Sequence, residues 1–338
     1  MTHKERVIRA LEHKTPEVCP WCIGFTIPAA RKMAEHYGDK DFETRLGNHL
    51  ATIEPGPPGR WVEVRPGFWR DEFGVVWNRT VDKDIGNPDE YPLADGDLDA
   101  FVFPDPDVDE RYATLGEFCE THRDDFLMGS IGFSLFERAW TLRGMEQLLV
   151  DMVTEAPFVE ALLEKIADWN LRVIDRMCAF PFDAIHTGDD WGQQHGLIMG
   201  PALWRKFIKP QVKRMYARSK SHGKFVSIHS CGDIREVLGD LVDIGLDMFN
   251  PFQPEVMDVE AVKREFGKHL TFHGGISTQR TLPYGTPGDV RAEVRRRIET
   301  IGADGGYVCA PAHAIPGDVP VENMVALVEE LQSQEKHA

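Results

Sequence analysis

Short apolar runs alternate with amphipathic stretches along the second half of the chain. Because successive residues in each run are apolar, the runs predict strands that are buried on both faces of a parallel sheet. Residues 234–242 place apolar side chains at i, i+3, i+4, i+7 and i+8, which predicts a helix. A second helix is predicted over 286–302, with Thr286-Pro287 at its start and Gly302 at its end. The predicted strands are 126–132, 183–188, 224–229, 246–250, 270–274 and 306–310.

The first 110 residues have a less regular pattern. Thr2 and Glu5 form a capping box, and the apolar stripe that follows over 7–11 predicts an N-terminal helix. A short strand is predicted over 18–25. Residues 51–110 are rich in Pro, Gly, Asp and Trp, so we expect an irregular hairpin and loop excursion over one mouth of the fold rather than a separate domain.

The alternation of strands and helices with short connections predicts an α/β fold with a parallel sheet. A doubly wound sheet would place a Gly-rich phosphate loop after its first strand, and the sequence contains none. Polar residues instead recur at the ends of several successive strands, as they do at the C-terminal mouth of a barrel. We therefore predict a (β/α)8 (TIM) barrel, with residues 1–338 as a single domain.

Charge and composition limit the classes of partner. With 55 acidic and 38 basic residues the formal net charge is −17, which disfavours binding to nucleic acid or to anionic membranes. The sequence has neither a signal-peptide pattern nor a run of 18 apolar residues, so we expect a cytoplasmic enzyme. The pair Cys19 and Cys22 has redox Cys-x-x-Cys spacing. Strand-like residues around it argue against the helix N-terminus that such a motif needs.

The strongest candidate chemistry is His229-Ser230-Cys231, which follows a predicted strand. Residues i and i+2 of an extended segment point to the same side, roughly 6.5–7 Å apart along the strand. An imidazole and a thiolate placed in this way can both bind one tetrahedral zinc ion. The alternative is a buried histidine beside an inert buried cysteine. The motif therefore predicts a metal centre that needs at least one more ligand from another strand end.

Two candidates for the third ligand lie close together near the last predicted strand. His313 follows that strand, whereas Cys309 lies within it. Functional side chains of a barrel gather at the C-terminal mouth, which favours His313, while the softness of a thiolate favours Cys309. We predict His313 and keep Cys309 as the alternative, with core packing as its non-functional explanation.

Other strand ends supply candidates for catalysis and substrate binding. Asp189 and Asp190 follow one predicted strand, and either could act as a catalytic carboxylate or orient a metal-bound histidine. Turn formation is the alternative for this Gly-Asp-Asp sequence. We expect His273 to act with these acids. The residues expected to line a pocket for a small aromatic or thiol substrate are Trp191, Gln193, Asn250, Gln253, Phe133 and Phe136.

Taken together, the short motifs at the predicted strand ends resemble those of the uroporphyrinogen decarboxylase superfamily, and the resemblance is clearest over residues 126–330. The resemblance implies a (β/α)8 barrel and one of two chemistries. The strings that carry it are Gly188-Asp189-Asp190-Trp191-Gly192, His229-Ser230-Cys231-Gly232, Asn250-Pro251-Phe252-Gln253, Gly274-Gly275-Ile276 and Ala310-Pro311-Ala312-His313.

The first chemistry implied is metal-free decarboxylation of a tetrapyrrole, for which the family uses an arginine-rich N-terminal segment. Residues 21–31 here contain one arginine and no such segment. The second is zinc-dependent methyl transfer with a corrinoid (cobalamin) protein, in which His-x-Cys and a distant Cys bind zinc. His229 and Cys231 match that pattern, and the distant Cys aligns near His313. The sequence thus favours a zinc methyltransferase acting on a small methyl donor or acceptor, such as a methoxy-aromatic in O-demethylation, or a thiol. A non-catalytic corrinoid- or substrate-binding protein is a further alternative.

Overall fold

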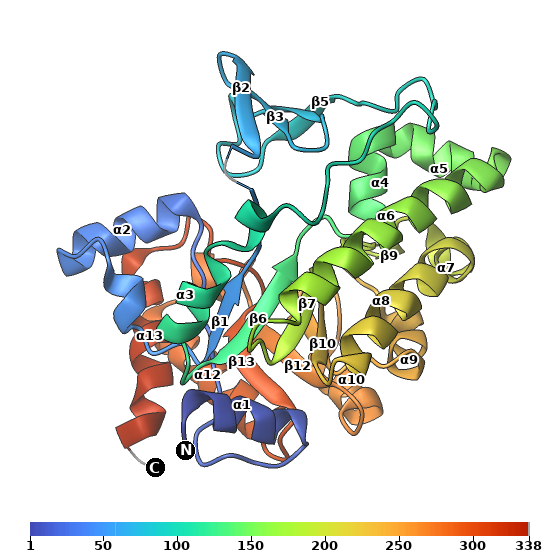
Figure 1. Ribbon diagram of the computed structural model, residues 1–338. Helices are drawn as coiled ribbons and strands as arrows, with labels where there is room; N and C mark the ends of the chain where they lie inside the picture. The colour runs from blue at the N-terminus through green and yellow to red at the C-terminus, as the bar shows by residue number, and fades with distance from the viewer. Residues whose placement is uncertain (58, 337–338) are drawn as a thin grey trace.

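The computed structural model describes residues 1–57 and 59–336, and it confirms the predicted α/β barrel (Figure 1). Seven parallel strands form one curled sheet in the order β1-β6-β7-β10-β11-β12-β13. All six strands predicted in the second half begin and end within two residues of the observed strands, and the largest displacement is that of 246–250, which is shifted by two residues at each end. The strands are β1 (Leu50–Ile53), β6 (Phe126–Ile131), β7 (Ala184–Gly188), β10 (Phe225–His229), β11 (Met248–Phe252), β12 (Thr271–Ile276) and β13 (Tyr307–Pro311).

An extended segment closes the barrel between β13 and β1. The Cys22 amide donates to the Cys309 carbonyl (3.1 Å), the Cys309 amide donates to Pro20 (2.8 Å), and the His49 amide donates to Trp21 (3.0 Å). The segment predicted as a strand over 18–25 is therefore extended, and the β-bridges that it forms are isolated ones at Trp21 and Phe25. This segment supplies the eighth side of the barrel.

The N-terminal helix α1 (His3–Leu11) begins at the predicted capping box, where Thr2 and Glu5 bond reciprocally to each other's backbone amides. Val7 and Leu11 of α1 pack with inward-facing side chains of the barrel strands, including Phe126, Met128 and Val308. Burial of each such side chain contributes about 1.5–3 kcal/mol. The amino end of the barrel is thus filled by apolar packing, which leaves the opposite end for chemistry.

Amphipathic helices surround the sheet, and their apolar faces pack on it (Figure 1). The helix predicted over 234–242 is α9 (Arg235–Asp243), in which Val237, Leu238 and Leu241 are buried. None of the helices described has the length and apolar character needed to cross a membrane. The remaining helices are α2 (Ile27–Tyr37), α3 (Leu115–Thr121), α4 (Phe136–Arg143), α5 (Met145–Thr154), α6 (Ala156–Met177), α7 (Gly200–Leu203), α8 (Lys209–Ser221), α10 (Val259–Phe266), α11 (Thr281–Tyr284), α12 (Pro287–Thr300) and α13 (Val321–Ser333).

The excursion between the first and second barrel strands is more regular than predicted, and it starts later. Residues 51–53 belong to the barrel strand β1 rather than to the excursion. The segment that follows folds as a four-stranded antiparallel sheet in the order β2-β3-β4-β5, which lies apart from the helices above the barrel (Figure 1). The segment predicted to be irregular thus contains four short strands. They are β2 (Trp61–Arg65), β3 (Phe68–Asp71), β4 (Val76–Asn78) and β5 (Asn87–Glu90).

Candidate metal centre

His229, Cys231 and His313 meet at the C-terminal mouth of the barrel. One ligand atom from each residue lies within 4.8 Å of the other two. Cys231 Sγ is 3.3 Å from His229 Nε2, and the rings of His229 and His313 are 5.6 Å apart. Donor atoms around a tetrahedral zinc ion with bonds of about 2.0–2.3 Å lie roughly 3.5 Å apart. The spacing of the His229 and Cys231 donors is therefore that of a zinc site.

Asn250 on β11 fixes the orientation of the His229 ring. The Asn250 Nδ2 atom donates to the His273 carbonyl (3.0 Å), so its Oδ1 atom is the acceptor that faces His229 Nδ1 at 2.6 Å. His229 Nδ1 consequently carries the proton, and the lone pair of Nε2 points toward Cys231. Metal-binding histidines are oriented in this way by a partner on the other ring nitrogen. Asn250, which we predicted to bind substrate, supports the His229 ring in this structure.

Two glycines let the loop after β10 pass close to the loop after β7. A Cβ atom on Gly232 would lie 2.3 Å from the Gly192 carbonyl carbon, and Gly232 has a φ of +85°. Only glycine adopts this conformation at such close range without strain. The Gly232 amide donates to Gln253 Oε1 (2.7 Å). Gln253, another predicted substrate-binding residue, thus holds in place the loop that carries Cys231.

Without a metal ion, both His229 and Cys231 are neutral at this centre. Burial, followed by the charges of Asp190 and Glu137, raises the pKa of the Cys231 thiol. Burial also lowers the pKa of His229, against the opposing effect of Asp190. A neutral imidazole is the form that binds a metal, and a bound divalent cation reverses the shift of the thiol by stabilising its thiolate. The donor set, two imidazoles and one thiolate beside a carboxylate, therefore fits zinc.

Cys309 does not join this cluster, because its side chain faces the helices. Its neighbour Val308 belongs to the packing inside the barrel, and successive side chains of a strand alternate between the two faces. The Cys309 thiol is completely buried, and burial raises its pKa to about 12. Burial likewise raises the pKa of Cys22 to about 12, which is the opposite of what redox chemistry at Cys19-x-x-Cys22 requires. Of the two candidates for the third ligand, His313 therefore lies with His229 and Cys231, and Cys309 does not.

The two adjacent acids have different surroundings. Asp189 is fully buried, and its carboxylate accepts hydrogen bonds from the Leu135, Phe136 and Glu137 amides at the start of α4. Asp190 is partly exposed, its Oδ1 accepts from the Cys231 amide (2.8 Å), and it lies 3.9 Å from His229 Nε2. Asp189 therefore stabilises the first turn of a helix, in contrast to the predicted catalytic role. Asp190 is the acid that lies beside the candidate metal ligands His229 and Cys231.

Two cavities meet at the candidate metal ligands. The first has a volume of about 560 Å³ and lies between the barrel mouth and the antiparallel sheet, with His229, His313 and Asp190 in its lining. The second has a volume of about 510 Å³ and is lined by Cys231, His313, Gln193 and Gln253. His313 borders both, so the three donors separate two spaces of ligand size.

Glu137 is a residue of this centre to which the sequence analysis assigned no role. It lines the first cavity, and burial together with the charges of Asp190 and Asp189 raises its pKa to about 9. At neutral pH Glu137 is therefore a protonated acid in the lining of the cavity that also contains His229 and His313. Its position at the start of α4, close in sequence to the predicted pocket residue Phe133, could have indicated that Glu137 lies near the site.

The remaining predicted residues divide between the cavity wall and the core. Phe133 lines the first cavity. Trp191 and Phe136 are fully buried, so they cannot contact a ligand as we predicted. Trp191 instead donates from Nε1 to Asp189 Oδ2 (2.5 Å). His273 lies one strand away from Asn250, and its buried Nδ1 atom has no hydrogen-bond partner among the described residues. Burial lowers the pKa of His273 to about 4.

Comparison with known proteins gives a consistent assignment. A family model described as uroporphyrinogen decarboxylase (URO-D) matches residues 85–334. The chain is 28% identical over 131 residues to the methylcobamide:CoM methyltransferase MtaA of Methanosarcina barkeri, covering 39% of this chain and 36% of that protein. It is 23% identical over 247 residues to a uroporphyrinogen decarboxylase of Methylococcus capsulatus, covering 69% and 67% of the two chains.

The fold has a solved counterpart as well. A methyltransferase from Methanosarcina mazei superposes over 100% of both chains with a TM-score of 0.75, at 19% sequence identity. The match to the M. barkeri methyltransferase spans only about a third of that protein's length. This match therefore does not assign that protein's reaction to the present chain. The family model covers most of the chain, and the barrel agrees with it. The chain therefore belongs to the uroporphyrinogen decarboxylase family.

Proposed function

We propose that this protein is a zinc-dependent methyltransferase that moves a methyl group between a small substrate and the cobalt of a corrinoid protein. The observation that carries the proposal is the convergence of the His229, Cys231 and His313 donors within 4.8 Å, with the His229 tautomer set by Asn250. The similarity to a methylcobamide:CoM methyltransferase supports the same reaction class.

His229, Cys231 and His313 would hold the zinc ion. When bound, zinc would act as a Lewis acid, either on the oxygen of a methoxylated donor or on the sulfur of a thiol acceptor. The chain's own residues would supply orientation and a proton. Asn250 keeps His229 Nε2 turned toward the site, and protonated Glu137 can give its proton to an oxygen that leaves as the methyl–oxygen bond breaks.

The cavity on each side of the cluster supports a reaction between two partners. A small substrate fits in the cavity of about 560 Å³ beneath the antiparallel sheet. The second cavity borders His313 and Cys231 from the other side and gives a second partner access to the same centre. We propose that the corrinoid protein approaches from this second side.

Metal-free decarboxylation of a tetrapyrrole is the second candidate, because uroporphyrinogen decarboxylases match a longer stretch of the chain. A substrate with eight carboxylates requires several unpaired basic groups. The first cavity contains three arginines, and two of them already pair with acids, Arg60 with Glu54 and Arg138 with Asp71. The charge of the cavity lining therefore favours the methyltransferase.

The test combines zinc content with activity. We expect the purified protein to contain about one zinc ion per chain, and a chelator to abolish methyl transfer from a methoxylated aromatic to reduced cobalamin. The variant Cys231→Ser should lose both zinc and transfer, whereas Cys178→Ser, which changes a cysteine outside the cluster, should keep both. Protein without zinc, or transfer that is unaffected by a chelator, would overturn the proposal. Full zinc loading with no transfer to cobalamin would favour a binding protein.

A further inference from the structure

The cavity beneath the antiparallel sheet has two chemically different ends. The barrel contributes the end that holds His229, His313 and Asp190. The antiparallel sheet contributes the opposite wall, with Trp61 on β2 and Arg79 just after β4. A ligand that fills this cavity therefore touches the metal centre with one group and the sheet with another.

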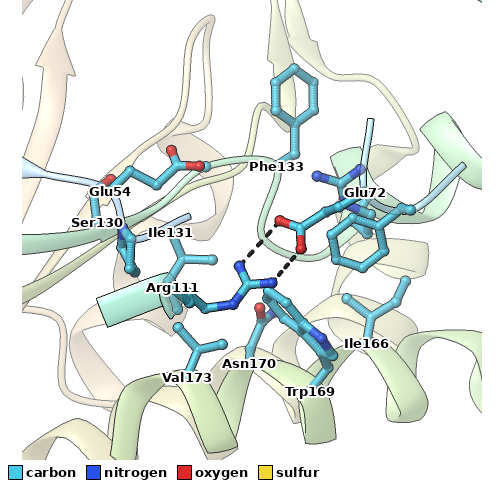
Figure 2. A pocket seen from close by; sticks show the side chains of 14 residues that line it. Glu54, Glu72, Arg111, Ser130, Ile131, Phe133, Ile166, Trp169, Asn170 and Val173 are labelled. Carbon is cyan, nitrogen blue, oxygen red and sulfur yellow. Dashed lines mark hydrogen bonds and ion pairs between the residues drawn. The ribbon is translucent and has the colours of Figure 1, made fainter. Parts of the chain in front are cut away.

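Most charged groups around this cavity cancel in pairs. Figure 2 shows one pair, in which the Arg111 guanidinium faces the Glu72 carboxylate beneath Phe133. Glu137 adds no charge near neutral pH, because its pKa is raised to about 9 by burial and by the neighbouring Asp190 and Asp189 carboxylates. The cancelling pairs are Glu54–Arg60 (3.2 Å), Asp71–Arg138 (3.1 Å) and Glu72–Arg111.

Arg79 is the exception. Its Nε atom donates to the Ile85 carbonyl (3.0 Å), and its guanidinium lies over the Trp61 ring at 4.0 Å. Over residues 1–57 and 59–336, no carboxylate forms an ion pair with its guanidinium, and Nε is its only side-chain atom with a hydrogen-bond partner. Asp84, which also lines the cavity, is exposed to solvent. Arg79 thus presents both terminal nitrogens without a partner, in a chain of net charge −17.

Aromatic side chains connect this arginine to the barrel. The rings of Trp61 and Trp77 meet edge to face at 5.9 Å, and those of Trp77 and Phe133 at 5.3 Å. All three line the cavity, and Phe133 adjoins Gly132 at the end of β6. Such edges and faces bind a flat aromatic ring well. The wall between the two ends is therefore suited to an aromatic ligand.

We infer that the small substrate is a methoxylated aromatic carboxylate, with its carboxylate bound by Arg79 and its methoxy group directed to the His229–Cys231–His313 cluster. The inference rests on the proposed methyltransferase function, to which it adds a substrate class. A guanidinium binds a carboxylate through two parallel hydrogen bonds, and the partly excluded site strengthens them. Burial lowers the pKa of Arg79, and the charges that act on it from beyond ion-pair distance oppose one another, Asp82 and Asp71 by attraction and Arg60 by repulsion.

The test compares two ligands that differ only in charge, 3,4-dimethoxybenzoate and 3,4-dimethoxybenzamide. Calorimetric titration of the zinc-loaded protein should show the benzoate bound about tenfold more tightly. In Arg79→Gln this preference should fall to about twofold or less, and Arg79→Lys should restore part of it. The matched control is Arg70→Gln, which removes an exposed arginine of β3 that lies outside the cavity lining.

The two hypotheses fail separately in this design. Equal affinity for the two ligands, no binding of either, or a benzoate preference that survives in Arg79→Gln would overturn the substrate inference. These titrations need no cobalamin, so they do not depend on methyl transfer. Transfer from neutral methoxy-aromatics in the Arg79→Gln variant should continue at the rate of the unchanged protein, because Arg79 acts only on the carboxylate. Absence of this transfer in the unchanged protein would overturn the proposed function, whatever the titrations show.

Discussion

Asn250 Oδ1 lies 2.6 Å from His229 Nδ1, and this contact leaves His229 Nε2 as the nitrogen that faces Cys231. We predict that Asn250→Leu weakens zinc binding about 10- to 100-fold, because the imidazole loses the partner that fixes its tautomer and orientation. Asn250→Asp keeps an acceptor and should bind zinc with nearly unchanged affinity. Competition with a chromogenic chelator measures both, and equal zinc affinity in the Leu variant would contradict the role assigned to Asn250.

His313 and Cys309 can be distinguished as ligands by substitution. Because His313 lies with His229 and Cys231 while Cys309 faces the helices, His313→Ala should lose most of its zinc and Cys309→Ser should retain it. His313→Cys restores a donor at the same position and should recover zinc binding. Zinc content by atomic absorption is the measurement. Loss of zinc from Cys309→Ser at full folding would instead make Cys309 the third ligand.

Asp189 and Asp190 should respond in opposite ways to the same change. Asp189→Asn places an amide group against the three backbone donors of α4 and should reduce the free energy of unfolding by about 2–4 kcal/mol. Asp190→Asn should leave unfolding nearly unchanged but reduce methyl transfer, because Asp190 lies beside His229. Chemical denaturation and transfer assays separate the two effects. Asp243→Asn, at an exposed helix end, is the control.

The sequence predicted the barrel well because local patterns define its parts. The strands 126–131 and 225–229 and the helix 287–300 follow from apolar runs and from the Thr286 capping box, which depend only on neighbouring residues. The His-x-Cys pair was predictable for the same reason. The choice of His313 over Cys309 also had a local signal, since Val308 and Cys309 alternate across the strand and only one can face inward.

The substrate cavity was less predictable because it depends on distant contacts. Arg79 and Trp61 reach the barrel only through the folded antiparallel sheet, whose strands are as short as three residues. The raised pKa of Glu137 needs the Asp190 carboxylate, which is 53 positions away along the chain. Trp191 and Asn250 lie at strand ends as expected. Their side chains form hydrogen bonds with Asp189 and His229, respectively, and the contact between Asn250 and His229 joins two strands, so it could not be predicted from the local sequence.

His49 makes stability sensitive to mild acid. It is fully buried beneath α1, its Nδ1 atom accepts from the Trp21 amide (3.4 Å), and its ring stacks on His3 at 4.4 Å. Burial, with added repulsion from His3 and Arg6, lowers its pKa to about 3. The unfolded chain, with a histidine pKa of about 6.5, therefore binds the proton first as pH falls. Stability contributed by neutral His49 is complete above about pH 6.5 and is lost progressively toward pH 3.

We expect this single group to reduce the free energy of unfolding by about 2–3 kcal/mol between about pH 6.5 and pH 4.5. In His49→Gln the fall over this interval should shrink by that amount, while His36→Gln, at an exposed histidine of α2, should leave it unchanged. Urea titrations at several pH values provide the measurement. The slope with pH is the informative quantity, because lost packing in His49→Gln shifts stability equally at every pH. An unaltered slope would mean that the His49 ring accepts a proton within the folded protein.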